Sequence, residues 1–193
     1  MQKIVADQLR QSIAVLTAAA DDIELHETLI HAAEKTAHSM RSGHKLLVAG
    51  NGGSAADAQH VVAEFVSRLV KDRPALRAIA LTTDSSILTG IGNDYGYERV
   101  FGRQIEALGQ PGDVFLAIST SGNSANIVRA LELAHSTGIF TIGLTGQNGG
   151  QMPKLCDYCL RMPSSITMNI QEAHLALEHI FCLLVEQIYF AIE

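Results

Sequence analysis

Two side chains that could do chemistry stand one helical turn apart in the stretch GNGGSAADAQHVVAEF, residues 50–65. In a helix, His60 and Glu64 are spaced i, i+4, so they lie on one face about 6 Å apart. This spacing suits metal ligation, a carboxylate that orients an imidazole, or an ordinary surface pair. On spacing alone, the surface pair is the commonest of the three.

The last predicted helix, residues 169–191, offers a second polar set within an apolar pattern: Gln171, His174, Glu178 and His179. Gln171 and His179 are about 80° apart around the helix, so they share one broad face, with Leu175 between them. Polar groups on an apolar stripe need partners once they are buried. Zinc accepts histidine nitrogen and carboxylate oxygen, and an amide oxygen is a less usual ligand. Spacing leaves a four-ligand site built from two helices as a hypothesis.

Two loops rich in glycine and hydroxyl groups, AGNGGS and STSGNS, each join an apolar run to a predicted helix. Backbone N–H groups at a helix start, helped by the helix dipole, bind anions. The second loop adds four hydroxyls within six residues: Ser119, Thr120, Ser121 and Ser124. Neither loop is a Walker A or a G-x-G-x-x-G motif, so a dinucleotide is not favoured.

The same loop residues also have an ordinary structural interpretation as turns and helix caps. Ser124 is a candidate N-cap, and Ser54 with Asp57 resembles a weak capping box. For one loop alone the two interpretations are balanced. Two such loops, each at the end of a different strand, favour a phosphate site.

Five short apolar runs alternate with helical patterns along the chain: HKLLVAG, RAIALTT, DVFLAIS, IFTIGLT and CDYCLRM. Helices are expected over residues 3–20, 22–42, 54–70, 85–108, 124–137 and 169–191. Near-continuous apolar strands between helices indicate a parallel sheet covered on both faces. The sequence therefore predicts one domain, residues 1–193, with an α/β fold. It is a three-layer α/β/α sandwich around a five-stranded parallel sheet, with two added N-terminal helices. Ligands in such sheets bind near the topological switch point, here beyond the first and third strands.

Composition narrows the class of partner and the compartment. Hydrophobic residues make up 47% and charged residues 18%, and the net charge is −6. The small charged fraction suggests surface hidden in an oligomer, and the absence of a basic face argues against nucleic acid. The N-terminus lacks a signal-peptide pattern, and the apolar run IFCLLVEQIYFAI is broken by Glu186 and is shorter than a membrane span. A cytoplasmic protein is expected.

Three cysteines, an odd number, also indicate a reducing compartment. Cys156 and Cys159 form a C-x-x-C pattern inside the predicted strand CDYCLRM. Residues three apart in a strand face opposite sides, so we expect buried thiols rather than a paired site.

Four stretches, GNGGSAADAQHVVAEF, LTTDSSILTGIGNDYGYE, AISTSGNSANIVRAL and IQEAHLALEHI, together resemble the phosphoheptose isomerase family of the SIS domain superfamily. The resemblance runs essentially from end to end. It implies a cytoplasmic homotetramer with active sites at subunit boundaries, residues 1–42 serving in oligomer packing. The implied reaction converts D-sedoheptulose 7-phosphate to D-glycero-D-manno-heptose 7-phosphate, the first step toward lipopolysaccharide heptose.

The resemblance also implies roles for individual residues. The phosphate would be bound by Ser119, Thr120, Ser121 and Ser124. The sugar site would be lined by Asn51, Gly52, Gly53, Ser54, Asn93 and Asp94. One zinc ion per subunit would be held by His60, Glu64, Gln171 and His179, of which Glu64 and Gln171 would also contact the substrate. Glu64 and His179 would be the catalytic acid–base residues.

The chain departs from the family pattern before IQE, where a basic residue is expected and Asn169 stands, preceded by Met168 in place of aspartate. An alternative function is that of a non-catalytic SIS protein that binds the replication initiator DnaA. Glu64, His179 and the intact GNGGSAADAQH loop speak against it. A phosphosugar-sensing regulator is a third class, but a fused DNA-binding or synthase domain is not present in the sequence.

Overall fold

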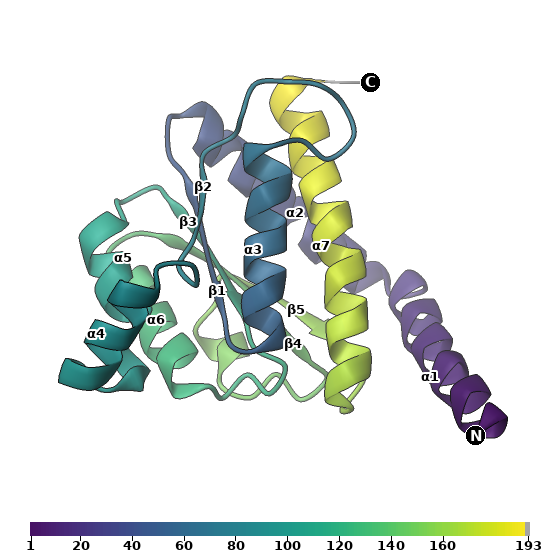
Figure 1. Ribbon diagram of the computed structural model, residues 1–193. Helices are drawn as coiled ribbons and strands as arrows, with labels where there is room; N and C mark the ends of the chain where they lie inside the picture. The colour runs from purple at the N-terminus through teal and green to yellow at the C-terminus, as the bar shows by residue number, and fades with distance from the viewer. Residues whose placement is uncertain (192–193) are drawn as a thin grey trace.

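The five apolar runs form one parallel sheet in the computed structural model, which describes residues 1–191 (Figure 1). The strands are β1 (Leu46–Gly50), β2 (Ala78–Ala80), β3 (Val114–Ile118), β4 (Phe140–Gly146) and β5 (Tyr158–Met162). The α-helices are α1 (Gln2–Ala20), α2 (Ile23–Arg41), α3 (Gly53–Val66), α4 (Ser85–Tyr95), α5 (Gly102–Leu108), α6 (Ala125–Ser136) and α7 (Thr167–Phe190). Two short 3₁₀ helices are η1 (Tyr97–Arg99) and η2 (Met152–Lys154). The predicted fold class is confirmed.

The strand order is β2-β1-β3-β4-β5, so the chain changes direction across the sheet after β1 and β2. The switch point lies between β1 and β3, as predicted. Gly50, the last residue of β1, is in register with Ile118, the last of β3. The loops that follow these strands therefore start side by side.

Two apolar clusters cover the two faces of the sheet. One buries residues of α2, α3 and α7, among them Ala33, Phe65 and Phe181. The other buries residues of α5 and α6, such as Ile105 and Leu131, with α4 packed against it. Figure 1 shows α3 and α7 together on one side of the sheet and α4, α5 and α6 on the other. The helices that carry the candidate ligands thus share one layer.

Two helical predictions were too long. The helix expected over 85–108 is divided into α4, η1 and α5, because Gly96 takes a φ of +89° that a helix cannot continue through. The helix expected over 54–70 ends at Val66. There the guanidinium of Arg73 donates to the carbonyls of Glu64 and Phe65, which belong to the last helical turn.

The two helices at the ends of the chain differ in surroundings. α1 extends away from the body of the protein (Figure 1), with Ile4, Val5, Leu9 and Ile13 each 60–61% exposed. Among the described helices, α7 alone has the length and apolar composition that a membrane span needs. It buries Ala173, Leu177 and Val185 in the same cluster as α2 and α3, which is the behaviour of a core helix.

Candidate active site

The loop between β1 and α3 approaches the start of α7 closely. Gly52, the N-cap of α3, has a φ of +58° that favours glycine. A methyl group on Gly53 would collide with the side-chain amide of Gln171. The glycines therefore let α7 place Gln171 against this loop. The predicted capping box is wrong, because α3 has no side-chain cap and Asp57 Oδ2 has no partner.

The loop between β3 and α6 holds its hydroxyl groups in a tight turn. Ser119 Oγ and Ser124 Oγ share a hydrogen bond at 3.0 Å, and the Asn123 amide donates to Ser121 Oγ at 3.2 Å. Gly122 has a φ of +65°, and the backbone of Gly149 leaves no room for a Cβ there. Ser124 stands at the N-cap position of α6, as expected, although its hydroxyl bonds to Ser119 instead of capping the helix.

An amide pair joins the two loops. Asn51 Nδ2 donates to Asn126 Oδ1 at 2.9 Å, and Asn126 Nδ2 donates to Asn51 Oδ1 at 2.9 Å. Asn126 lies in the first turn of α6 and is 4% exposed. Sequence reasoning missed Asn126, although its position directly after the STSGNS loop is a usable signal. The amide pair fixes the β1–α3 loop relative to the hydroxyl-rich loop.

A polar pocket of about 300 Å³ opens beside the hydroxyl-rich loop. Its lining combines this loop with the segments after β4 and β5 and the start of α7: Thr120, Ser121, Asn123, Gly146, Gln147, Asn148, Ser164, Ser165, Thr167 and Ile170. Hydroxyl and amide groups at the carboxyl edge of a parallel sheet suit an anionic ligand. No lysine or arginine is among these lining residues. The pocket therefore has the chemistry expected for a phosphate held by neutral donors.

The two helices beside the loops bring together three of the four predicted metal ligands. His60 and Glu64 on α3 meet His179 on α7, and one donor atom of each lies within 4.8 Å of the others. The Nε2 atoms of His60 and His179 are 2.7 Å apart, and His60 Nε2 is 3.7 Å from Glu64 Oε1. The Glu64 side chain is 19% exposed and that of His60 is 40% exposed. The cluster is therefore open to a small ligand yet mostly enclosed by protein.

Buried ionisable groups flank this cluster. Burial, together with the charge of Asp57, raises the pKa of Glu178 to about 8. Burial also raises the pKa of Asp57, against the opposing influence of His60. Neither Glu178 oxygen has a hydrogen-bond partner. Burial lowers the pKa of His174 to about 4, although its Nε2–H donates to the Thr145 carbonyl at 3.2 Å.

Other predicted site residues lie apart from this cluster. Asn93 and Asp94 are at the end of α4, in the opposite helical layer, where Asn93 Nδ2 donates to Asp94 Oδ1 at 2.7 Å. Asn169 is buried and donates to Ser12 Oγ on α1 and to Glu172, each at 3.2 Å. The residue that departs from the family pattern therefore joins α7 to α1. Met168 is 48% exposed.

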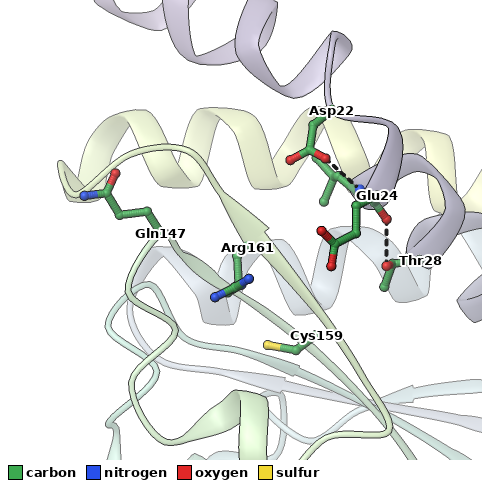
Figure 2. Close-up of a pocket in the computed structure, with 7 residues that line it drawn as sticks. Asp22, Glu24, Thr28, Gln147, Cys159 and Arg161 are labelled. Atoms are coloured by element: carbon green, nitrogen blue, oxygen red, sulfur yellow. Dashed lines mark hydrogen bonds between the residues drawn. The ribbon is translucent and has the colours of Figure 1, made fainter.

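A second polar pocket lies between the start of α2 and the edge strand β5. Figure 2 shows Cys159 and Arg161 of β5 on one side of this pocket, Glu24 of α2 on another, and Gln147 farther along. Apart from Gln147, it shares no lining residue with the polar pocket beside the hydroxyl-rich loop, called the loop pocket below. The predicted site residues are not part of its lining. We therefore do not assign this second pocket to the candidate active site.

The expectation that the two C-x-x-C thiols face opposite sides is wrong. Cys156 precedes β5, which begins at Tyr158, so strand alternation does not govern it. The two sulfurs lie 2.7 and 3.4 Å from the position that a Cβ on Gly143 would take. A hydrogen bond between the thiols is the main cause that raises the pKa of Cys156 and lowers that of Cys159. Both thiols are half-buried and free.

Comparison with known proteins agrees with the fold. The chain matches the SIS domain family over residues 9–146, which defines the class of fold. It is 52% identical to the phosphoheptose isomerase of Aneurinibacillus thermoaerophilus, over 98% of this chain and 96% of that protein. The solved phosphoheptose isomerase of Neisseria gonorrhoeae superposes with a TM-score of 0.90 at 42% identity, covering 96% of this chain and 98% of that one. That of Francisella tularensis gives 0.92 at 35% identity, with the same coverage.

The chain therefore belongs to the phosphoheptose isomerase family of SIS-domain proteins. The resemblance expected from the four sequence stretches is confirmed. These relatives give no support to the DnaA-binding alternative.

Proposed function

We propose that the protein is an aldose–ketose isomerase that converts D-sedoheptulose 7-phosphate to D-glycero-D-manno-heptose 7-phosphate, an early step in making heptose for lipopolysaccharide. The observation that carries this proposal is the His60–Glu64–His179 cluster, in a chain about 50% identical to phosphoheptose isomerases. Two loops rich in hydroxyl and amide groups precede the helices α3 and α6 in the same chain. The reaction is an intramolecular oxidoreduction, because C2 of the ketose is reduced while C1 is oxidised.

The residue types suit this chemistry. The hydroxyl-rich loop, Ser119, Thr120, Ser121 and Ser124, would bind the phosphate and leave C1 and C2 free to reach the helices. Asn51, Gly52, Gly53 and Ser54 would line the sugar chain, and Asn93 and Asp94 are proposed to complete this lining. Glu64 would remove the proton from C1 and return it to C2 of the cis-enediol. His179 would move the hydroxyl protons, because an imidazole can donate a proton from one ring nitrogen and accept one at the other.

The donor set also suits a divalent metal ion. Two imidazole nitrogens and a carboxylate oxygen that converge within 4.8 Å are donors that zinc prefers. We propose that His60, Glu64, Gln171 and His179 hold one zinc per subunit. Bound zinc would polarise the carbonyl and stabilise the enediolate. Glu64 then has two roles in tension, since a carboxylate that binds a metal tightly is a weaker base.

The exposed apolar face of α1 supports a homotetramer with active sites at subunit boundaries. An apolar groove of about 400 Å³ lies between α1, α2 and α7, lined by residues such as Leu16, Leu29 and Ile180. Exposed apolar side chains on one helix beside an apolar groove support association with another subunit. Residues 1–42 are proposed to pack between subunits, in a cytoplasmic enzyme. Size-exclusion chromatography with light scattering should give a molecular mass four times that of one chain.

A turnover assay tests the function directly. Purified protein with zinc supplied should convert sedoheptulose 7-phosphate to the aldose, and a chelator should reduce the rate. Metal analysis should find one zinc per chain. If the zinc-loaded protein shows no turnover, the enzyme assignment fails. Full activity after complete chelation would instead remove the metal from the mechanism.

A further inference from the structure

A buried arginine outside the ligand set connects the two helices that carry the ligands. Arg73 lies in the segment between α3 and β2, and its side chain is 4% exposed. Its Nε donates to Glu186 Oε2 on α7 at 2.7 Å. Its Nη2 donates to the Glu64 carbonyl at 2.7 Å, and its Nη1 to the Phe65 carbonyl at 2.8 Å. One guanidinium thus spans the last turn of α3 and a carboxylate of α7.

The hydrogen bonds of Arg73 reach one proposed metal ligand and the helix that carries another. The Glu64 carbonyl belongs to the same residue whose carboxylate faces His60. Glu186 is seven residues after His179, about 20° around the helix, so both project from one face of α7. The charges of Glu64, Arg73 and Glu186 all act on the thiol of Cys182, which lies between these positions on α7. The Arg73–Glu186 pair therefore lies on the ligand-bearing face of α7, about two helical turns beyond His179.

Apolar packing alone fixes the two helices less well. Phe65 and Phe181 meet edge to face, with ring centroids 6.1 Å apart. The pair prefers this geometry, but the burial of apolar area that makes up most of the helix contact is non-directional. Hydrogen bonds from a planar, rigid guanidinium are directional and resist a slide of one helix along the other. The planar guanidinium of Arg73 is therefore suited to fixing the distance between α3 and α7.

We propose that Arg73 is a positioning residue that, through Glu186 and the Glu64 carbonyl, holds Glu64 and His179 at the spacing that metal binding and isomerisation require. This inference rests on the proposed function. Lysine cannot replace Arg73, because a single ammonium cannot reach Glu186 and two helical carbonyls in one plane.

The test compares Arg73→Lys with the wild type in zinc affinity, measured by competition with a chromogenic chelator, and in kcat and KM. Zinc affinity should fall about 10-fold or more, which is typical when groups supporting metal ligands are lost. kcat should fall by a similar factor while KM stays within about 3-fold, because the phosphate loop lies on other elements. Glu186→Gln keeps an acceptor for Nε and should lose less than Arg73→Lys.

Two controls separate positioning from general stability. Arg77 lies in the same segment and donates to the Gly43 carbonyl at 2.8 Å, away from α3 and α7. Arg77→Lys should leave zinc affinity within about 2-fold. Leu131→Ala on α6 creates a cavity in the other apolar cluster and lowers stability without touching the helix pair. If Leu131→Ala weakens zinc binding as much as Arg73→Lys, the proposal is overturned.

A paired substitution covers the case in which Arg73→Lys does not fold. Arg73→Met with Glu186→Leu removes both charges and leaves neither buried alone, so the chain should still fold. It should show the same loss of zinc affinity and kcat. An unchanged zinc affinity and kcat in this folded variant would overturn the proposal. Wild-type protein without turnover would instead refute the proposed function, so the two failures are distinguishable.

Discussion

The two halves of the candidate site are built in different ways. The loop half, residues 51–54 and 119–124, comes from two short segments at the ends of neighbouring strands, joined by the Asn51–Asn126 amide pair. The helix half, His60, Glu64 and His179, joins side chains 119 residues apart in sequence. Most polar atoms of the loop half have local partners, whereas buried carboxyls beside the helix half have none.

Because of this difference, we expect the two halves of the site to have different roles in the reaction. We expect the preformed turn of the loop half to contribute to substrate affinity, because a fixed backbone presents its donors to a phosphate at a low ordering cost. Side chains brought together by helix packing can be tuned by burial, as the shifted pKa values of Glu178 and His174 indicate. We therefore expect substitutions in the helix half to alter kcat and pH behaviour, and those in the loop half to alter KM.

The largest effect is expected for Glu64→Gln. Glutamine keeps the size of the side chain but cannot accept the C1 proton, so kcat should fall about 10³-fold. Stopped assays on sedoheptulose 7-phosphate measure the rate, and circular dichroism checks that the fold is intact. Retention of more than a tenth of the wild-type kcat would assign the base to another residue.

A smaller effect is expected in the pH dependence of stability. The folded pKa of His174, about 4, is below the ordinary histidine value of 6.5, so the unfolded chain binds more protons between these values. The folded state should therefore lose about 2 kcal/mol as the pH falls from 7 to 5 through this group. Urea unfolding of chelator-treated protein measures the change at both pH values.

In His174→Gln this contribution should be missing, so the variant should lose about 2 kcal/mol less than the wild type over the same interval. Because the unfolding free energy of each protein is compared between its own two pH values, the constant destabilisation caused by the substitution cancels. Glu178 acts in the opposite sense, because its raised pKa favours the folded state as the pH falls, but it is common to both proteins. Identical pH dependence in the two proteins would show that His174 is not held neutral.

The smallest effect is expected in the loop half. Ser121→Ala removes one hydroxyl beside the loop pocket, and the KM for the substrate should rise about 10-fold. kcat should change little, because the phosphate does not react. Ser136→Ala, at the far end of α6, is the matched control. A large fall in kcat at constant KM would remove the distinction between the halves.

Much of this arrangement could be predicted from local sequence. The apolar runs placed all five strands, and the glycine- and serine-rich loops placed the loop half at the switch point. His60 and Glu64 could be paired because helical spacing fixes them relative to each other. Their meeting with His179 could not be derived from spacing, since it depends on how α3 packs against α7. The family resemblance, and not the local sequence pattern, predicted that His179 joins His60 and Glu64.

The errors also have physical causes. α3 ends early because a side chain seven residues beyond it, Arg73, takes up the carbonyls of its last turn. Asp57, read as a cap, is instead a half-buried carboxyl beside His60. Cys156 and Cys159 meet because the strand starts two residues later than the apolar run suggested. Each error involves a contact between segments, which periodicity does not encode.

The place of α7 in the chain has a consequence for biosynthesis. It is made after all five strands, yet it contributes to the loop pocket, the ligand cluster and the contact with Arg73. At a synthesis rate of roughly 5–20 residues per second, the apolar face that α7 covers stays uncovered for seconds on the ribosome. The nascent chain should therefore be vulnerable to aggregation at this face. The proposed metal ion should bind only after α7 has docked, because His179 lies on this helix.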